Sequence, residues 1–138
     1  MFFQLTDEQI ELQTLVRKFA SNAIAPNAER WDEESYFPRE LFQPAAELGL
    51  AGLQIPEDDG GTGLSRLTSA LLYEEIGRVD MATAVWLSVH NMAAGIVHRY
   101  GSADQRERWL PDMVAGRSLG AFSLRIMSLA NRSSSSSK

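Results

Sequence analysis

The 138-residue sequence predicts an all-α fold: a bundle of five or six helices, then a short strand start and a disordered, serine-rich tail. Three observations support this class. Helix-capping residues recur along most of the chain, and apolar residues follow the spacing of a helix face. The alternation of apolar and polar residues that is typical of strands is almost absent before residue 119.

The first predicted helix begins at Asp7, because Thr6 and Gln9 have the spacing of a capping box. Its apolar residues keep a helical spacing until Pro26, which interrupts the pattern because proline has no backbone N–H. We expect a further helical turn or two over residues 27–34.

A second region of helix is expected from Pro38 to Gly49, where glycine is a common helix end. Pro44 lies inside this pattern and should kink the helix or delay its start. Residues 49–63 are predicted to form a loop, because they are short of helical periodicity and carry acidic residues followed by glycines.

Three capped helices follow the loop. Ser65 is the predicted cap of a helix with apolar residues at 67, 70, 71 and 76, and Asp80 caps the next helix, which ends at Tyr100. Ser102 and Gln105 repeat the capping-box spacing before the last helix. These elements define a helical domain over residues 1–118, a strand start over 119–124 and a disordered tail over 125–138, where five serines follow one another.

Composition excludes several classes of protein. The chain has no cysteine, only two histidines, and a formal net charge of −5 without a basic cluster. We therefore expect no disulfide scaffold, no metal site and no nucleic acid. His90 and His98 would lie about 12 Å apart along one helix, too far to share a metal ion, and we predict a structural role for His90. Without a secretory signal or a membrane span, a soluble, cytoplasmic protein is expected.

Most of the chain resembles a known family, the acyl-CoA dehydrogenases, over residues 5–124 and in the family's order. The segments that carry the resemblance to its N-terminal all-helical domain are LTDEQIELQTLVRKFA, FPRELFQPAAELGLAGLQIPEDDGGTGLS, YEEIGRVD, SVHN and YGSADQRERWLPDMVAGRSLGAFSL. The resemblance implies an oxidoreductase that uses FAD to remove hydrogens from the α and β carbons of an acyl-CoA, and an electron-transfer flavoprotein as the partner that reoxidises the flavin.

The resemblance also implies site residues. Phe122, Ser123 and Leu124 match the start of the family's flavin-facing strand, and an ordinary edge strand is the alternative interpretation. Val85, Trp86 and Val89 match helix positions that line the acyl pocket in the family, which suggests that they form such a pocket here. Packing in the core is the alternative interpretation and is more common for residues on one helix face. The bulk of Trp86 would shorten such a pocket and favour short or branched acyl groups. No catalytic residue is assigned.

The sequence departs from the family after Leu124, where the Glu-Pro pair and the glycine-containing turn of the family are replaced by Ile126, Met127 and a serine run. We therefore expect a truncated form that is inactive by itself. A helical interaction module without catalysis and a nonfunctional remnant are the alternatives, and a homo-oligomer is left open. Visible flavin absorbance distinguishes the enzyme portion from the interaction module. Thermal melting distinguishes the interaction module from the nonfunctional remnant.

Overall fold

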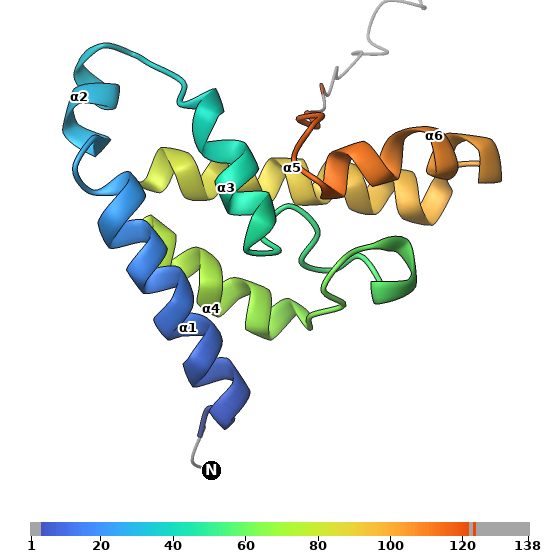
Figure 1. Ribbon diagram of the computed structural model, residues 1–138, viewed down its shortest axis with the longest axis horizontal. Coiled ribbons are helices and arrows are strands. Elements are labelled where there is room, and N and C mark those ends of the chain that lie inside the picture. Colours follow the sequence, from blue (N-terminus) through green and yellow to red (C-terminus); the bar gives the residue numbers. More distant parts are fainter. Residues whose placement is uncertain (1–3, 122, 124–138) are drawn as a thin grey trace, which may run out of the picture.

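The computed structural model describes residues 4–121 and residue 123, and this part of the chain is an assembly of α-helices (Figure 1). The α-helices are α1 (Asp7–Phe19), α2 (Ala28–Glu33), α3 (Phe42–Glu47), α4 (Arg66–Gly77), α5 (Met81–Tyr100) and α6 (Ala103–Val114). Short helical turns of other types are η1 (Ala20–Ile24), η2 (Arg39–Leu41) and η3 (Glu57–Asp59). The predicted all-α class is confirmed.

The helix starts follow the capping residues of the sequence. Thr6 and Gln9 form the predicted capping box at α1, and Ser102 and Gln105 form the one at α6. Ser65 accepts a hydrogen bond from the backbone N–H of Thr68 at the start of α4. These side chains satisfy backbone N–H groups that have no partner inside the helix.

The predicted effect of Pro44 is confirmed as a delayed helix start. A 3-10 turn, η2, precedes α3, so that Pro44 falls in the first turn of α3, where a missing N–H costs nothing. α3 ends at Glu47, and Gly49, two residues later, has a φ of 80°, which lies in the left-handed region. Two backbone bonds close this end: Gly49 N–H donates to Ala46 O (2.8 Å) and Leu50 N–H to Ala45 O (3.0 Å).

The helices pack around one main core. α4 packs against both α1 and α5, and α6 packs along the C-terminal part of α5 (Figure 1). The loop between α3 and α4 folds back into this core instead of lying on the surface, because its apolar side chains are buried with those of the helices. The largest fully buried apolar side chains are Val16, Ile24, Leu50, Leu53, Ile55, Leu72, Ile76 and Leu87.

The segment after α6 differs from the expected strand. Residues 119–121 and 123 have no strand pairing, since a β-ladder needs a second strand and the described residues contain none. Phe122, Leu124 and the predicted tail over residues 125–138 lie outside the described residues. No helix in the described part of the chain is long and apolar enough to cross a membrane.

Removal of the α5 cap should destabilise the fold measurably. Asp80 accepts a hydrogen bond from the backbone N–H of Thr83 (2.9 Å) and another from the hydroxyl of this buried residue. We expect Asp80→Ala to lower the free energy of unfolding by about 1–2 kcal/mol, measured by urea denaturation. Asp80→Asn, which keeps an acceptor oxygen, is the control and should lose clearly less; equal losses would contradict the capping role.

Candidate functional site

An apolar groove runs between α4 and α5 and has a volume of about 470 Å³. The side chains and backbone of small and apolar residues line most of it: Ala70, Tyr73, Gly77, Met81, Ala84 and Val85. At its rim, Arg78 Nη2 lies 2.7 Å from Glu74 Oε1, and this exposed ion pair is the charged part of the groove. The groove is therefore suited to an apolar ligand with polar groups at one edge.

The groove continues toward the C-terminal end of α5. A neighbouring hollow of about 280 Å³ shares Tyr73 and Ser88 with it and adds Met92, Ile96 and Tyr100. On α5, the exposed apolar residues recur at the spacing of one helix face, from Met81 (66% exposed) through Val85 (53%) to Met92 and Ile96. A continuous apolar stripe on a helix surface is typical of a binding face.

Tyr73 lines both hollows and adds a phenol group to the groove wall. Burial raises the pKa of its phenol well above the usual value, because the charged phenolate would be poorly solvated there. The hydroxyl therefore stays protonated at physiological pH and is able to donate a hydrogen bond to a ligand in the groove.

The structure separates the three residues predicted to line an acyl pocket. Val85 lines the groove, whereas Trp86 packs its ring edge-to-face against Phe37 (5.4 Å between centroids) and Phe42 (5.8 Å). Trp86 lines a different hollow, of about 270 Å³, near α2. Val89 is half-buried on α5. The shared pocket of these residues stays a prediction, and Trp86 has an alternative role in packing.

The residues predicted to face a flavin are described only in part. Ser123 is exposed, while Phe122 and Leu124 lie outside the described residues. Their cofactor role also stays a prediction.

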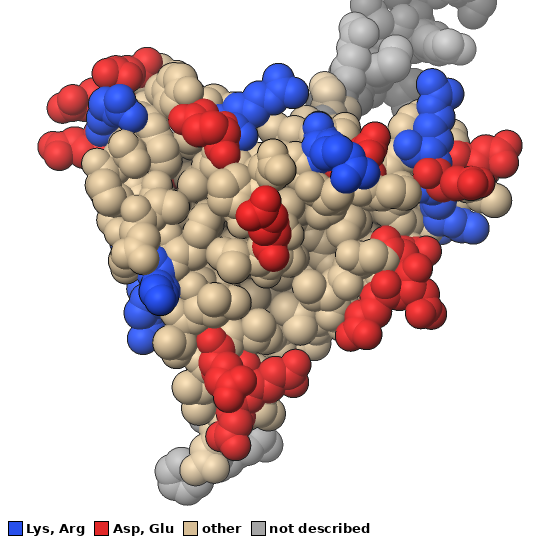
Figure 2. All heavy atoms as spheres, viewed as in Figure 1, with Lys and Arg blue, Asp and Glu red and all other residues tan. Residues whose placement is uncertain are grey.

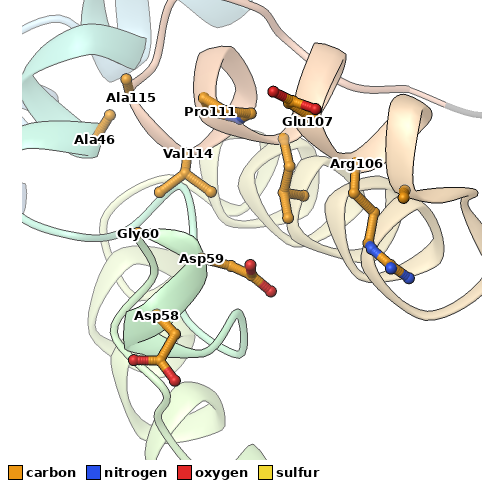
Figure 3. Close-up of a pocket in the computed structure, with 11 residues that line it drawn as sticks. Ala46, Asp58, Asp59, Gly60, Arg106, Glu107, Pro111, Val114 and Ala115 are labelled. Carbon is orange, nitrogen blue, oxygen red and sulfur yellow. The ribbon is translucent and has the colours of Figure 1, made fainter.

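Another hollow, of about 760 Å³, lies between the loop before α4 and the helix α6 (Figure 3). Its apolar part includes Val114, and charged side chains line it from both sides: Asp58 and Asp59 from the loop, and Arg106 and Glu107 from α6. None of the predicted site residues lines this hollow.

Charge is distributed unevenly over the molecule. On the face shown in Figure 2, charged side chains of both signs lie mostly toward the edges, and an acidic side chain lies near the centre of an otherwise uncharged area. The acidic run over residues 57–59 is an exposed turn, as expected. Among the described residues, no three His, Cys, Asp or Glu side chains are grouped so that they could hold a metal ion. His98 Nδ1 lies 2.9 Å from Asp59 Oδ2, while His90 is buried elsewhere and hydrogen-bonded, which confirms its structural role.

The fold is a helical domain with an apolar groove between α4 and α5. The family model for the acyl-CoA dehydrogenase N-terminal domain matches residues 6–117, and the chain belongs to this family. The chain is 40% identical over 120 residues to the mitochondrial isobutyryl-CoA dehydrogenase of Dictyostelium discoideum, covering 87% of this chain and 29% of that protein. It is 42% identical over 124 residues to the acryloyl-CoA reductase (NADH) of Anaerotignum propionicum, covering 90% of this chain and 32% of that protein.

The fold matches solved structures of the family as well. A glutaryl-CoA dehydrogenase from Mycobacterium smegmatis, in complex with FADH2, superposes with a TM-score of 0.80 at 28% identity, over 83% of this chain and 30% of that one. The chain therefore spans about a third of the length of the relatives it matches. It corresponds to the N-terminal portion of an acyl-CoA dehydrogenase.

Sequence reasoning missed the contribution of α4 to the groove. Tyr73 and Gly77 of α4 form its wall opposite Met81 and Val85, and neither was a candidate. The available signal was the spacing of Met81, Val85 and Met92, which places three unbranched or small apolar residues on one exposed helix face.

Proposed function

We propose that this chain supplies the N-terminal helical domain of an FAD-dependent enzyme that oxidises acyl-CoA thioesters, and that the groove between α4 and α5 forms one wall of the acyl-binding site. The observation that carries the proposal is the apolar stripe of α5, open along the groove, in a chain that belongs to the acyl-CoA dehydrogenase family. Val85 would contact the acyl group, and the Tyr73 hydroxyl is available to a polar atom beside it.

Short or branched acyl groups are the proposed substrates. Two relatives that are 40% identical or more have names that refer to isobutyryl-CoA and acryloyl-CoA, both of which carry short acyl groups. The bulk of Trp86 does not support this preference directly, because its ring packs against Phe37 and Phe42 and lines a different hollow from the groove.

FAD would supply hydride transfer, and this chain's residues would bind and orient the reactants. Ser123 is exposed, and its proposed role toward FAD, like those of Phe122 and Leu124, follows the family resemblance. An electron-transfer flavoprotein is the proposed electron acceptor, following the family resemblance. The cytoplasmic location stays a prediction, and the relative from Dictyostelium discoideum is named as a mitochondrial protein.

These 138 residues alone are proposed to be inactive, because two thirds of each relative has no counterpart in them. The test is flavin retention after purification, read as visible absorbance, for this chain alone and for this chain with the remaining portion of the Dictyostelium relative supplied in trans. We expect colour only in the second case. A yellow preparation of the chain alone that oxidises an acyl-CoA would overturn the proposal.

The groove itself is tested in a chimera in which residues 6–117 replace the matching part of the Dictyostelium enzyme. Val85→Asp should raise the KM for isobutyryl-CoA roughly tenfold, because a carboxylate replaces an apolar side chain that the ligand covers. Ile10→Asp on α1, which changes a side chain of similar exposure (48% against 53%), is the matched control and should leave the KM unchanged. If both changes affect the KM equally, the result would contradict the proposal that the groove is part of the acyl-binding site.

A helical interaction module is the second candidate, because the same exposed stripe of α5 would also suit a partner protein. It requires no flavin. A chimera that folds but neither binds FAD nor turns over isobutyryl-CoA would favour this candidate over the enzyme.

A further inference from the structure

We propose that His90 is a positioning residue that holds the backbone of Gly120 and thereby sets where the chain leaves the helical bundle. The functional importance of this position rests on the proposed function, since the three residues predicted to face the flavin, Phe122, Ser123 and Leu124, begin two positions after Gly120 in the sequence. The positioning itself rests on contacts within the described residues.

The hydrogen bonds of His90 define its tautomer. The ring is fully buried on α5, with Nε2 3.1 Å from the carbonyl oxygen of Ala51 and Nδ1 2.8 Å from the backbone nitrogen of Gly120. A carbonyl oxygen only accepts, so Nε2 carries the proton; a backbone N–H only donates, so Nδ1 is the acceptor. Both ring nitrogens are satisfied by a neutral imidazole in this one tautomer.

The ring therefore joins three separate parts of the chain. It connects α5 to the loop after α3 through Ala51, and to the segment after α6 that contains Gly120, called the exit segment here. The edge-to-face contact with Phe42 of α3, with ring centroids 4.6 Å apart, restricts the orientation of the imidazole from a third side. An acceptor held this rigidly defines the position of the amide that donates to it.

Gly120 fits this place because it has no side chain. A Cβ at this position would lie 2.6 Å from Met113 Cε, 3.0 Å from Ala93 Cβ and 3.3 Å from His90 Nδ1. The Met113 side chain is flexible and can rotate away, whereas the contact with Ala93 Cβ is tight, so a side chain at position 120 would press the backbone away from the ring. The exit segment is thus held by close packing and by a directional hydrogen bond at the same residue.

Protonation of His90 is incompatible with this arrangement. An imidazolium would direct a second N–H at the N–H of Gly120, and two donors do not form a hydrogen bond. The groups of Phe42, Ala51, Met113 and Gly120 that meet the ring carry no formal charge, and the backbone of Ala51 and Met113 favours the cation less than burial opposes it. Burial accordingly lowers the pKa of His90, which keeps the ring neutral and the exit segment docked at physiological pH.

Two substitutions separate the two hydrogen bonds. His90→Asn places an amide oxygen near the position of Nδ1 and keeps an acceptor for Gly120, whereas His90→Gln places an amide N–H near the position of Nε2 and keeps a donor for Ala51. In this chain, we expect hydrogen exchange of the Gly120 amide to be similar in the wild type and His90→Asn. In His90→Gln it should be roughly fivefold faster or more, which corresponds to the loss of one hydrogen bond.

Equal exchange of the Gly120 amide in both variants, whether fast or slow, would overturn the positioning role, because loss of core packing alone would affect both alike. If either variant does not fold, the proposal is tested on the wild type by the ¹⁵N chemical shifts of its imidazole rings. We expect a neutral ring with its proton on Nε2 at His90, and His98, the second of the two histidines, is the internal reference. The opposite tautomer, or a charged ring at pH 7, would contradict the proposal.

The link to the cofactor is tested separately in the chimera with the Dictyostelium enzyme. His90→Gln should shift the visible absorbance bands of the bound flavin, and His90→Asn should leave them in place. An unchanged spectrum in His90→Gln, together with faster Gly120 exchange, would refute the functional part of the proposal alone. If the chimera binds no flavin, this result contradicts both the proposed function and the link between His90 and the cofactor. The positioning role of His90 is then still tested by hydrogen exchange of the Gly120 amide.

Discussion

Gly61→Ala is expected to lower the free energy of unfolding by about 3 kcal/mol, because the added methyl group would overlap backbone atoms. A Cβ on Gly61 would lie 2.6 Å from the carbonyl carbon of Ile55 and closer still to its carbonyl oxygen. A flexible side chain would relieve such an overlap by rotating. A carbonyl group moves only together with the backbone of the loop.

The loop has little freedom to make that movement. Gly61 N–H donates to Pro56 O (3.0 Å), and Gly63 N–H donates to Ile55 O (2.8 Å), so the two segments of the loop are tied to each other. The side chain of Ile55 is buried in the core. Displacing its backbone would therefore cost both hydrogen bonds and packing.

Gly95→Ala is the matched control and should have the opposite sign. Gly95 lies inside α5, and a Cβ there would meet no atom within 4 Å. Alanine in a helix interior is more stable than glycine by about 0.5–1 kcal/mol, so this variant should melt at a higher temperature than the wild type. Thermal and urea denaturation measure both variants. A Gly61→Ala protein as stable as the wild type would show that the loop adapts freely.

The sequence alone was sufficient to predict the helices, because their ends depend on nearby residues. The hydrogen bonds of Thr6, Ser65, Asp80 and Ser102 all join residues three positions apart. The close packing at Gly61 was not predictable in this way. It depends on the return of the loop to Ile55, and a glycine run without periodicity indicates a loop but not what the loop contacts.

The buried face of α4 shows a second limit of sequence patterns. The predicted apolar residues of this helix include Leu67, which is exposed, whereas the buried face contains Thr68 and Glu75. An apolar pattern does not identify a buried carboxylate, because its burial depends on a partner from another helix. The groove was missed for the same reason, since its walls come from α4 and α5 together and the pattern of one helix does not show which other helix lies beside it.

The partner of that carboxylate is Arg17, and Arg17→Met is expected to destabilise the protein far more than Glu75→Gln does. Arg17 of α1 forms two hydrogen bonds of 2.9 Å with Glu75 of α4, through Nε and Nη2. The Glu75 side chain is 1% exposed and that of Arg17 is 57% exposed. Removing the arginine therefore leaves a buried charge, while removing the carboxylate leaves a cation that water solvates.

The two single changes differ in magnitude for this reason. A buried carboxylate without its partner costs roughly 3–5 kcal/mol, and Arg78, whose Nη1 lies 3.5 Å from Glu75 Oε1, offsets only part of this cost. Glu75→Gln should cost about 1 kcal/mol, the value of hydrogen bonds to an exposed partner. Adding Glu75→Gln to Arg17→Met should recover stability, because the double variant no longer buries a charge. A double variant that is less stable than both single variants would contradict this account.

The pH dependence of unfolding tests the same pair independently. In the wild type, the hydrogen bonds and charge of Arg17 lower the pKa of Glu75 below its ordinary value. The pair therefore stabilises the fold above the pKa of the unfolded chain, about 4.3, and the contribution is lost as the pH falls through the lower folded pKa.

In Arg17→Met, burial raises the pKa of Glu75 instead, so its contribution is most favourable at low pH and is lost as the pH rises through the folded value. As the pH falls from 7 toward the unfolded pKa, Arg17→Met should gain stability relative to the wild type, and Glu75→Gln should show neither trend. The measurement is the urea midpoint at each pH, and parallel curves for the wild type and Arg17→Met would show that Glu75 is solvated rather than buried.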